Sequence, residues 1–166
     1  MAWLSEDDYR LIQNSVPIPC VDIAPLRLSE EGAIKGIGLI FRDTPHQGRR
    51  WCLVGGRVLR NETLASAVSR QLRQTLGDAI RFQLDADAQP VYIAQYFPTR
   101  QPVGVVDPRQ HAITMNYCLE ITGQIVPQDE ALEFRWFNPD SLPGAEQFGF
   151  EQDRVLRECL ARWNIK

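Results

Sequence analysis

Lysine is almost absent from this sequence, because only Lys35 and Lys166 occur among its 18 basic residues. The other 16 are arginines, and the 21 acidic residues leave a net charge of −3 at pH 7. A protein with this charge balance has no overall attraction for nucleic acid or for an anionic membrane surface. We therefore expect neither a nucleic-acid nor a membrane partner, and any use of the arginines must be local.

Long hydrophobic runs and paired cysteines are absent as well. A membrane span needs about 18 consecutive apolar residues, and a secretory signal needs a cationic start followed by an apolar segment. The sequence contains neither pattern. Its four cysteines form no CxxC pair, which argues against a zinc site and a disulfide framework. These absences predict a cytoplasmic protein whose cysteines are buried among apolar neighbours.

The composition that is present fits one globular domain. At about 150 residues per domain, a chain of 166 residues has little length left for a second one. Hydrophobic residues make up 44% and charged residues 23%, which argues against a disordered or fibrous protein. We expect a single domain over residues 1–166, with no internal repeats.

Half of the arginines are concentrated between residues 42 and 81. Eight arginines and three acidic residues give this segment a charge of +5, whereas the remaining ten basic and 18 acidic residues give −8. One interpretation is a general bias toward arginine. The other is a site in which planar guanidinium groups bind phosphate. Composition alone does not separate the two.

Hydrophobic periodicity predicts an α/β protein. Residues 1–19 are expected to form a short helix and a lead-in, and residues 150–163 a C-terminal helix. A central helix is predicted over 63–76, with Asn61 as its cap and Gly77 as its end. Segments rich in β-branched and aromatic residues predict strands at 20–26, 33–41, 51–54, 90–97, 113–121 and 133–137. Short strands with these helices favour a mixed sheet packed between helical layers.

The most informative segment, residues 55–77, reads as a Gly-Gly turn, a loop and a helix. Glycine lets the backbone approach a ligand closely, and a helix that begins nearby offers N–H groups to an anion. The segment resembles the Nudix box, G-x5-E-x7-R-E-U-x-E-E-x-G-U, in which U is a bulky apolar residue. The matching positions are Gly56, Glu62, Arg70, Leu72 and Gly77. The resemblance implies a Nudix-type α/β/α sandwich, in which Arg70 braces Glu62.

The same segment departs from the Nudix pattern where the family has three helix glutamates. This chain has Gln71, Gln74 and Thr75 there. Positions three and four residues apart share a helix face, and in the family that face holds Mg²⁺. Amide and hydroxyl oxygens carry no charge, so we expect Mg²⁺ to bind weakly or not at all. The usual attack of a metal-activated water on phosphorus is therefore in doubt.

Over residues 7–142 the chain is most similar to the GDP-mannose mannosyl hydrolases, a Nudix branch that releases GDP from the anomeric carbon of the sugar. The resemblance implies that Arg42 and Arg57 bind the diphosphate, Asp22 the sugar and Tyr117 the phosphate side. Two arginine forks would stabilise the charge that gathers on a departing nucleoside diphosphate. Each residue also has a structural alternative: the arginines as solvated charges, Asp22 as a strand cap, and Tyr117 as core.

The general base of that branch is missing, because its loop glutamine and histidine correspond to Glu130 and Ala131. Glu130 is the first candidate for proton abstraction, ahead of Asp129 and His111. With the carbonyl of Gly55, Glu130 is also the candidate ligand for any Mg²⁺.

Three functions stay open at this point. The first is binding of a nucleoside diphosphate sugar with hydrolysis at the glycosyl carbon. The second is a Nudix-derived nucleotide-binding module or sensor that has lost catalysis. The third is ordinary pyrophosphohydrolase activity, for which Asp129 and Glu130 offer few carboxylates. In each case the partner is a small nucleotide. Nudix proteins often form dimers, so the resemblance also suggests a homodimer.

Overall fold

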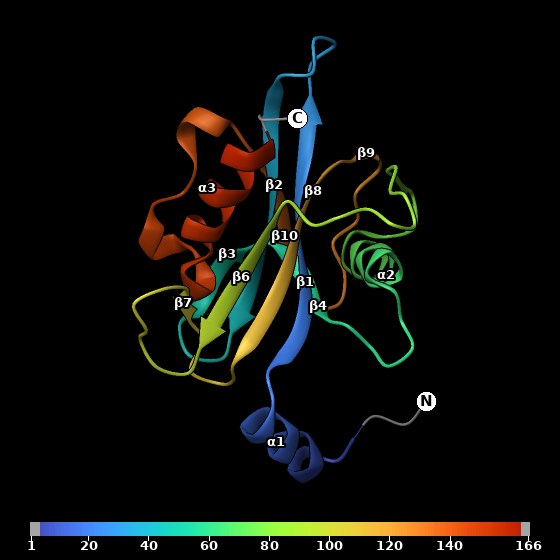
Figure 1. Ribbon diagram of the computed structural model, residues 1–166. Helices are drawn as coiled ribbons and strands as arrows, with labels where there is room; N and C mark the ends of the chain where they lie inside the picture. Colours follow the sequence, from blue (N-terminus) through green and yellow to red (C-terminus); the bar gives the residue numbers. More distant parts are fainter. Residues whose placement is uncertain (1–3, 164–166) are drawn as a thin grey trace.

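One sheet between helices forms the body of the protein in the computed structural model, which describes residues 4–163 (Figure 1). Helix α2 (Leu64–Leu76) covers one face of the sheet and α3 (Gln152–Trp163) the other, whereas α1 (Glu6–Ser15) lies at one end. The predicted α/β class with a mixed sheet is confirmed. Residues 1–3 and 164–166, at the ends of the predicted domain, lie outside the described residues.

Most of the longer strands lie within three residues of the predicted ranges, but the predicted strand at 51–54 is divided between two strands. The main sheet contains β1 (Ile18–Leu28), β2 (Ile34–Thr44), β3 (Gly48–Cys52), β4 (Val54–Arg57), β6 (Tyr92–Phe97), β7 (Val105–Val106), β8 (Ala112–Glu120) and β10 (Glu133–Phe137). The predictions missed β7 and the separate two-stranded sheet of β5 (Ile80–Arg81) and β9 (Thr122–Gly123).

Strand β1 is the centre of the sheet. It pairs in parallel with β8 and in antiparallel fashion with β2 and β4. A strand with neighbours on both sides and helices above and below is buried on both faces, which requires a nearly continuous apolar run. The residues from Cys20 to Leu26 are accordingly all buried. Asp22 is the one charged residue in that run, so its burial needs an explanation of its own.

Helix α2 begins and ends at identifiable caps. The Thr63 hydroxyl accepts a hydrogen bond from the N–H of Ser66, and Gly77 ends the helix with a φ of 89°. Asn61 is not the cap, because it lies two residues before Thr63 and has a φ of 65°. The apolar face of α2 packs against β4 and β1, and its Leu72 is fully buried. This packing fixes where the polar face of the helix points.

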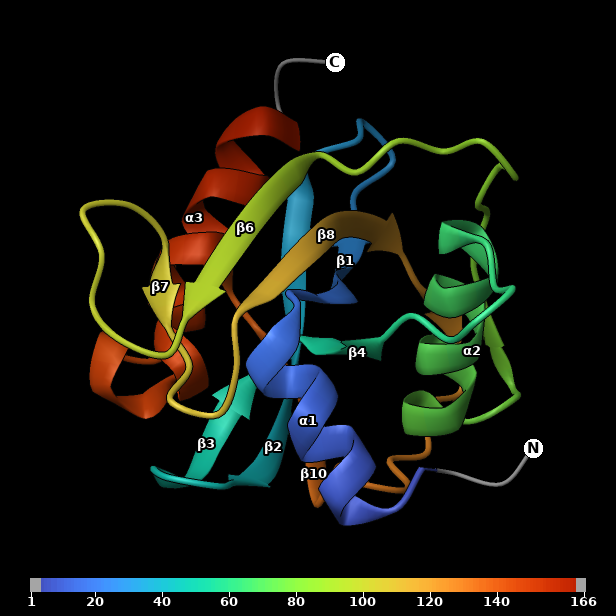
Figure 2. The same cartoon turned by 60° about the horizontal axis from the view of Figure 1, so that its bottom comes forward.

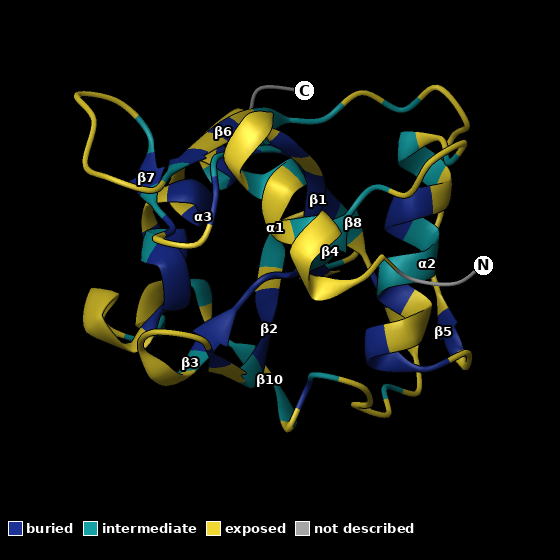
Figure 3. Cartoon of the chain, turned by 90° about the horizontal axis from the view of Figure 1, so that it is seen from below, coloured by how far each residue is buried: buried dark blue, intermediate teal, exposed yellow. Residues whose placement is uncertain are grey.

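The two other helices differ in how much they bury. Helix α3 packs against β6 and β8 and starts at Gln152, two residues later than predicted. Phe150 and Glu151 have positive φ and belong to the short 3₁₀ helix η3 that precedes it. Helix α1 is capped by Ser5, as expected, but it has no buried residue. It lies beside β4 at the end of the sheet (Figure 2), and its surface is mostly exposed (Figure 3).

Two predictions from the sequence concern membrane-spanning segments and cysteines. Within residues 4–163, no helix is long and apolar enough to cross a membrane. The four cysteines are all free and buried, as the sequence predicted.

Candidate functional site

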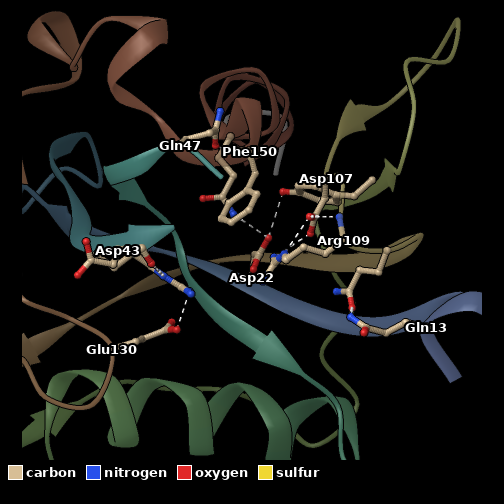
Figure 4. Close-up of polar contacts among 12 residues, drawn as sticks. Gln13, Asp22, Asp43, Gln47, Asp107, Arg109, Glu130 and Phe150 are labelled. Carbon is tan, nitrogen blue, oxygen red and sulfur yellow. Dashed lines mark hydrogen bonds and ion pairs between the residues drawn. The ribbon is translucent and has the colours of Figure 1, made fainter. Parts of the chain in front are cut away.

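A pocket of about 370 Å³ opens beside residues 55–77, the segment that resembles the Nudix box. Its wall on one side comes from β4, α2 and the loop that carries Asp129 and Glu130. On the other side it comes from α1 and the segment Asp107–Ala112. Asp22 lies in the wall between them, beside the Asp107–Arg109 pair in Figure 4. The pocket therefore gathers charged residues from distant parts of the chain.

Gly55 and Gly56 lie inside strand β4, so the predicted Gly-Gly turn is wrong. They pair with Asp22 and Val21 of β1. A Cβ at Gly55 would lie 2.1 Å from Oδ1 of Asp22, and one at Gly56 would lie 2.5 Å from Nε2 of Gln71. Glycine is needed at Gly55, because the backbone carbonyl of Val21 would also lie only 2.4 Å from such a Cβ. At Gly56 the close atoms belong to the end of the flexible Gln71 side chain, which can move aside.

Asp22 is only 8% exposed and is held by two donors. The Tyr96 hydroxyl and Nε2 of Gln152 both donate to its Oδ2, at 3.3 Å and 3.2 Å. The amide of Gln152 is oriented in turn, because its Oε1 accepts from the N–H of Leu53 at 2.9 Å. Burial raises the pKa of Asp22 to about 7, although Tyr96 and nearby Arg42 oppose the rise. The carboxyl therefore changes charge near neutral pH, which makes it a candidate proton acceptor as well as a sugar contact.

Glu130 forms an ion pair with Arg42. The distance from Oε2 of Glu130 to Nη1 of Arg42 is 2.6 Å. Its other oxygen, Oε1, is buried and has no hydrogen-bond partner among the described residues. Burial raises the pKa of Glu130, and the positive charges of Arg42 and Arg109 oppose the rise. A buried carboxylate oxygen without a partner is costly, and a ligand hydroxyl or a water molecule that reaches it would satisfy it.

Two more arginines line the pocket, and sequence reasoning singled out only Arg57. The guanidinium of Arg57 lies 4.3 Å from the ring centre of Tyr9 in α1. Arg109 is fixed by two bonds to Asp107, from Nε at 2.9 Å and from Nη2 at 2.8 Å. It also lies 4.8 Å from the ring centre of Phe150. The acidic residue two positions before Arg109 is its only signal in the sequence.

Tyr117 is not brought into the pocket. Its hydroxyl donates to the carbonyl of Ala88 at 3.3 Å. Successive residues of a strand point to opposite faces, and Thr114, three residues earlier in β8, lines the pocket. Tyr117 therefore points away from it, and the phenol that reaches the pocket is Tyr96, which donates a hydrogen bond to Asp22. The phosphate-side role expected of Tyr117 is not supported by its position.

Neither histidine lines the pocket, although His111 lies between Gln110 and Ala112, which do. His111 stacks on Phe97, with ring centres 4.7 Å apart and planes inclined by 26°. His46 lies in an exposed turn, as expected of a loop residue. Of the three candidate bases, only Asp129 and Glu130 line the pocket.

The predicted brace between Arg70 and Glu62 is present. Nε of Arg70 donates to Oε1 of Glu62 at 2.7 Å, and Nη2 donates to Oε2 at 2.8 Å. Nη2 also donates to the carbonyl of Arg57 at 2.9 Å. Hydrogen bonds from Arg70 lower the pKa of Glu62, which keeps it ionised. The brace ties the loop after β4 to helix α2 and so sets the position of Arg57.

An Arg70→Ala variant is expected to lower the free energy of unfolding by about 2 kcal/mol, because Glu62 would keep a half-buried charge without its partner. This loss corresponds to a decrease in Tm of roughly 4–8 °C for a domain of this size. Thermal unfolding followed by circular dichroism measures it. Arg73→Ala is the matched control, because Arg73 is exposed and lies three residues after Arg70 in α2. Equal decreases in both variants would rule out a special role for the brace.

The donor atoms around the pocket do not fit a divalent metal. Oε1 of Gln74 accepts a bond from Arg70 at 3.1 Å, and Thr75 is only 2% exposed. Glu130 is already neutralised by Arg42. In residues 4–163, no three His, Cys, Asp or Glu side chains gather as a metal site would require. A Mg²⁺ site made by Glu130 and the Gly55 carbonyl is therefore not supported, because neutral oxygens and one paired carboxylate bind Mg²⁺ poorly.

Comparisons with known proteins give a family and a fold. The family model described as Domain of unknown function (DUF4916) matches residues 1–165. The chain is similar to a protein from Jonesia denitrificans described as a possible asymmetric diadenosine tetraphosphate (Ap4A) hydrolase, with 31% identity and a TM-score of 0.83. That similarity covers 90% of this chain and 96% of the other. None of the curated proteins matches the sequence.

Two more distant structures agree on the fold. A MutT NUDIX hydrolase from Burkholderia pseudomallei is 20% identical, with a TM-score of 0.66, and covers 87% of this chain and 98% of its own. An ADP-ribose pyrophosphatase from Streptococcus suis is 18% identical, with a TM-score of 0.56, and covers 88% and 91%. At these identities the similarity shows the fold alone.

Proposed function

This chain belongs to the family described as Domain of unknown function (DUF4916) and has the fold of the Nudix hydrolases, and from this premise we propose that it binds a nucleoside diphosphate sugar and hydrolyses it at the glycosyl carbon. The observation that carries the proposal is one pocket that combines three arginines with four carboxyl groups, of which the proposed reaction uses Asp22 and Glu130. Arginines suit a diphosphate, and carboxyl groups suit sugar hydroxyls and an attacking water.

The proposed reaction uses only the side chains of this chain. Oε1 of Glu130 takes a proton from water as its oxygen forms a bond to the anomeric carbon. The bond between that carbon and the phosphate oxygen breaks, and its electron pair leaves with the nucleoside diphosphate. Arg42 and Arg57 stabilise this developing charge more strongly than they stabilise the bound substrate. Asp22 holds a sugar hydroxyl. The GDP-mannose branch, a cytoplasmic location and a homodimer belong to this proposal as well.

A second candidate is a binding module without turnover. The ion pair between Arg42 and Glu130 favours it, because a carboxylate neutralised by a guanidinium is a weaker base. The similarity to the Jonesia denitrificans protein adds dinucleoside polyphosphates to the ligands that need testing.

A product assay separates these functions. The protein is incubated in H₂¹⁸O with GDP-, UDP- and ADP-sugars, ADP-ribose and Ap4A, with and without Mg²⁺. Free sugar that contains ¹⁸O, together with an unlabelled nucleoside diphosphate, supports the proposal. Label in a phosphate product indicates attack on phosphorus and contradicts it. No product with any compound, together with a ligand-dependent rise in Tm, supports the binding module.

Arg57→Ala is expected to weaken nucleotide binding by about ten- to a hundredfold, because a charge-assisted hydrogen bond to phosphate is lost. The ligand-dependent rise in Tm decreases with it. Arg60→Ala is the matched control, since Arg60 is an exposed arginine of the same positive segment that does not line the pocket. If both variants lose affinity equally, only the overall charge of the segment matters.

A further inference from the structure

The pocket contains three arginines and a donor set that does not suit a divalent metal. Arg42, Arg57 and Arg109 all line it. A diphosphate brings negative charge into a partly closed space, and this charge must be balanced. In the absence of suitable metal ligands, the arginines are the cations that remain for this purpose.

Arg109 has the rigidity expected of a binding residue. Its Nε and Nη2 both donate to Asp107, whose side chain is only 4% exposed, and the Phe150 ring lies against the guanidinium. Nη1 forms no hydrogen bond within residues 4–163 and is the remaining donor edge of the group. A guanidinium held in this way loses little entropy when it binds an anion.

The backbone that presents Phe150 is strained. Phe150 and Glu151 have φ values of 57° and 56°, which side-chain-bearing residues rarely adopt in succession. The N–H of Phe150 is held by Oε1 of Gln47 at 2.8 Å, and Glu151 forms ion pairs with Arg100 and Arg154. Strain that the surroundings stabilise is a feature of ligand sites. Here it places an aromatic ring under Arg109.

Arg109 acts electrostatically on two groups that the other arginines also affect, Cys20 and Glu130. Burial raises the pKa of the Cys20 thiol to about 12, and both Arg57 and Arg109 oppose this rise. Arg42 and Arg109 likewise oppose the raised pKa of Glu130. Arg109 therefore acts on the part of the pocket near Arg57 and also on the part near Arg42.

We propose that the pocket binds the diphosphate of its ligand without a divalent metal, and that Arg109 is a further ligand-binding residue. Its guanidinium, which Asp107 holds in place, adds a third set of N–H donors to those of Arg42 and Arg57. This inference rests on the proposed function, since it assigns the binding mode of the same ligand.

Isothermal titration with GDP, ADP and UDP, in EDTA and in excess Mg²⁺, tests the binding mode. The Kd in EDTA is expected to lie within about threefold of the Kd in Mg²⁺. A tightening by Mg²⁺ of about tenfold or more overturns the inference but leaves the proposed function intact. If none of the nucleotides binds under either condition, the proposed function fails and the inference fails with it. Titration of the ligand-free protein with Mn²⁺, followed by water proton relaxation, gives a separate measure. A tight Mn²⁺ site overturns the inference alone.

Arg109→Ala is expected to weaken binding in EDTA by about ten- to a hundredfold, whereas Arg60→Ala stays within about twofold of the wild type. Circular dichroism of the ligand-free variant establishes that it is folded. If it is not, Arg109→Lys serves instead. A lysine keeps one charge that pairs with Asp107, but it lacks the planar fork needed to hold the ligand as well, so a loss of about tenfold is expected. Wild-type affinity in either folded variant overturns the role of Arg109.

Discussion

Glu130→Gln is expected to lower kcat by about 10²- to 10⁴-fold while the affinity for nucleoside diphosphates stays the same or increases. Glutamine keeps the size of the side chain but cannot accept the proton of the attacking water. It also leaves Arg42 without its carboxylate partner, so the guanidinium becomes more available to the diphosphate. Product formation measures the first effect, and titration with GDP measures the second. A loss of kcat without a loss of affinity distinguishes a base from a residue that only shapes the pocket.

Asp129→Asn tests the competing base. Asp129 is exposed, lines the same pocket and has a φ of 53°, which asparagine tolerates. If Glu130 is the base, the Asp129 variant should keep most of the turnover. Loss of turnover in Asp129→Asn, with near-normal activity in Glu130→Gln, would assign the base to Asp129 instead. Unchanged kcat in both variants would mean that neither carboxylate takes the proton.

The parts of the site that depend on local spacing could be predicted from the sequence. Glu62 and Arg70 are separated by eight residues, and the cap at Gly77 ends the helix that carries Arg70. Both features follow from positions along one loop and one helix. The burial of Leu72 follows from the same helical period. These elements need no knowledge of how distant segments pair.

The parts that depend on strand pairing could not be predicted. Gly55 resembles a turn residue in the sequence, and only its pairing with Asp22 shows that it belongs to a strand. The choice between Tyr96 and Tyr117 depends on which face of the sheet each side chain reaches, and a shift of one residue reverses that face. The short strand β7 (Val105–Val106) is too short to show any periodicity.

Arg109 was missed for a different reason. Its position in the pocket depends on a loop that returns to the pocket and on Phe150, which lies 41 positions further along the chain. The composition indicates a concentration of arginines in residues 42–81, and Arg109 lies outside that segment. The pocket takes two arginines from that segment and a third from outside it.

Asp22→Asn is expected to remove a pH dependence of stability. The pKa of Asp22 is about 7 in the folded protein, against an ordinary value of 3.8, because burial disfavours the charged form. The folded state therefore holds this proton more tightly than the unfolded state does. Its contribution to stability is complete below about pH 4 and is lost as the pH rises through about 7. Between pH 5 and pH 8 the wild type should lose about 3 kcal/mol through this group, and the variant should not.

Urea unfolding at pH 5 and pH 8 measures this difference, and Asp22→Ala provides the comparison. Alanine also cannot ionise, but it leaves the hydroxyl of Tyr96 and the amide of Gln152 without their acceptor. Asp22→Ala should therefore be less stable than Asp22→Asn by about 1–3 kcal/mol at both pH values. An equal pH dependence in the wild type and Asp22→Asn would contradict the raised pKa.

The same variant connects stability with function. Above pH 7 the Asp22→Asn protein should be more stable than the wild type. Asparagine keeps an acceptor for Tyr96 and Gln152 but carries no buried charge. A carboxyl at this position is thus a cost to the fold, of the kind found where a residue serves a ligand. Asp22→Asn is expected to gain stability at pH 8 and to lose at least about tenfold in kcat/KM for the nucleotide sugar. A variant that gains stability with full activity would show that Asp22 has no role in the reaction.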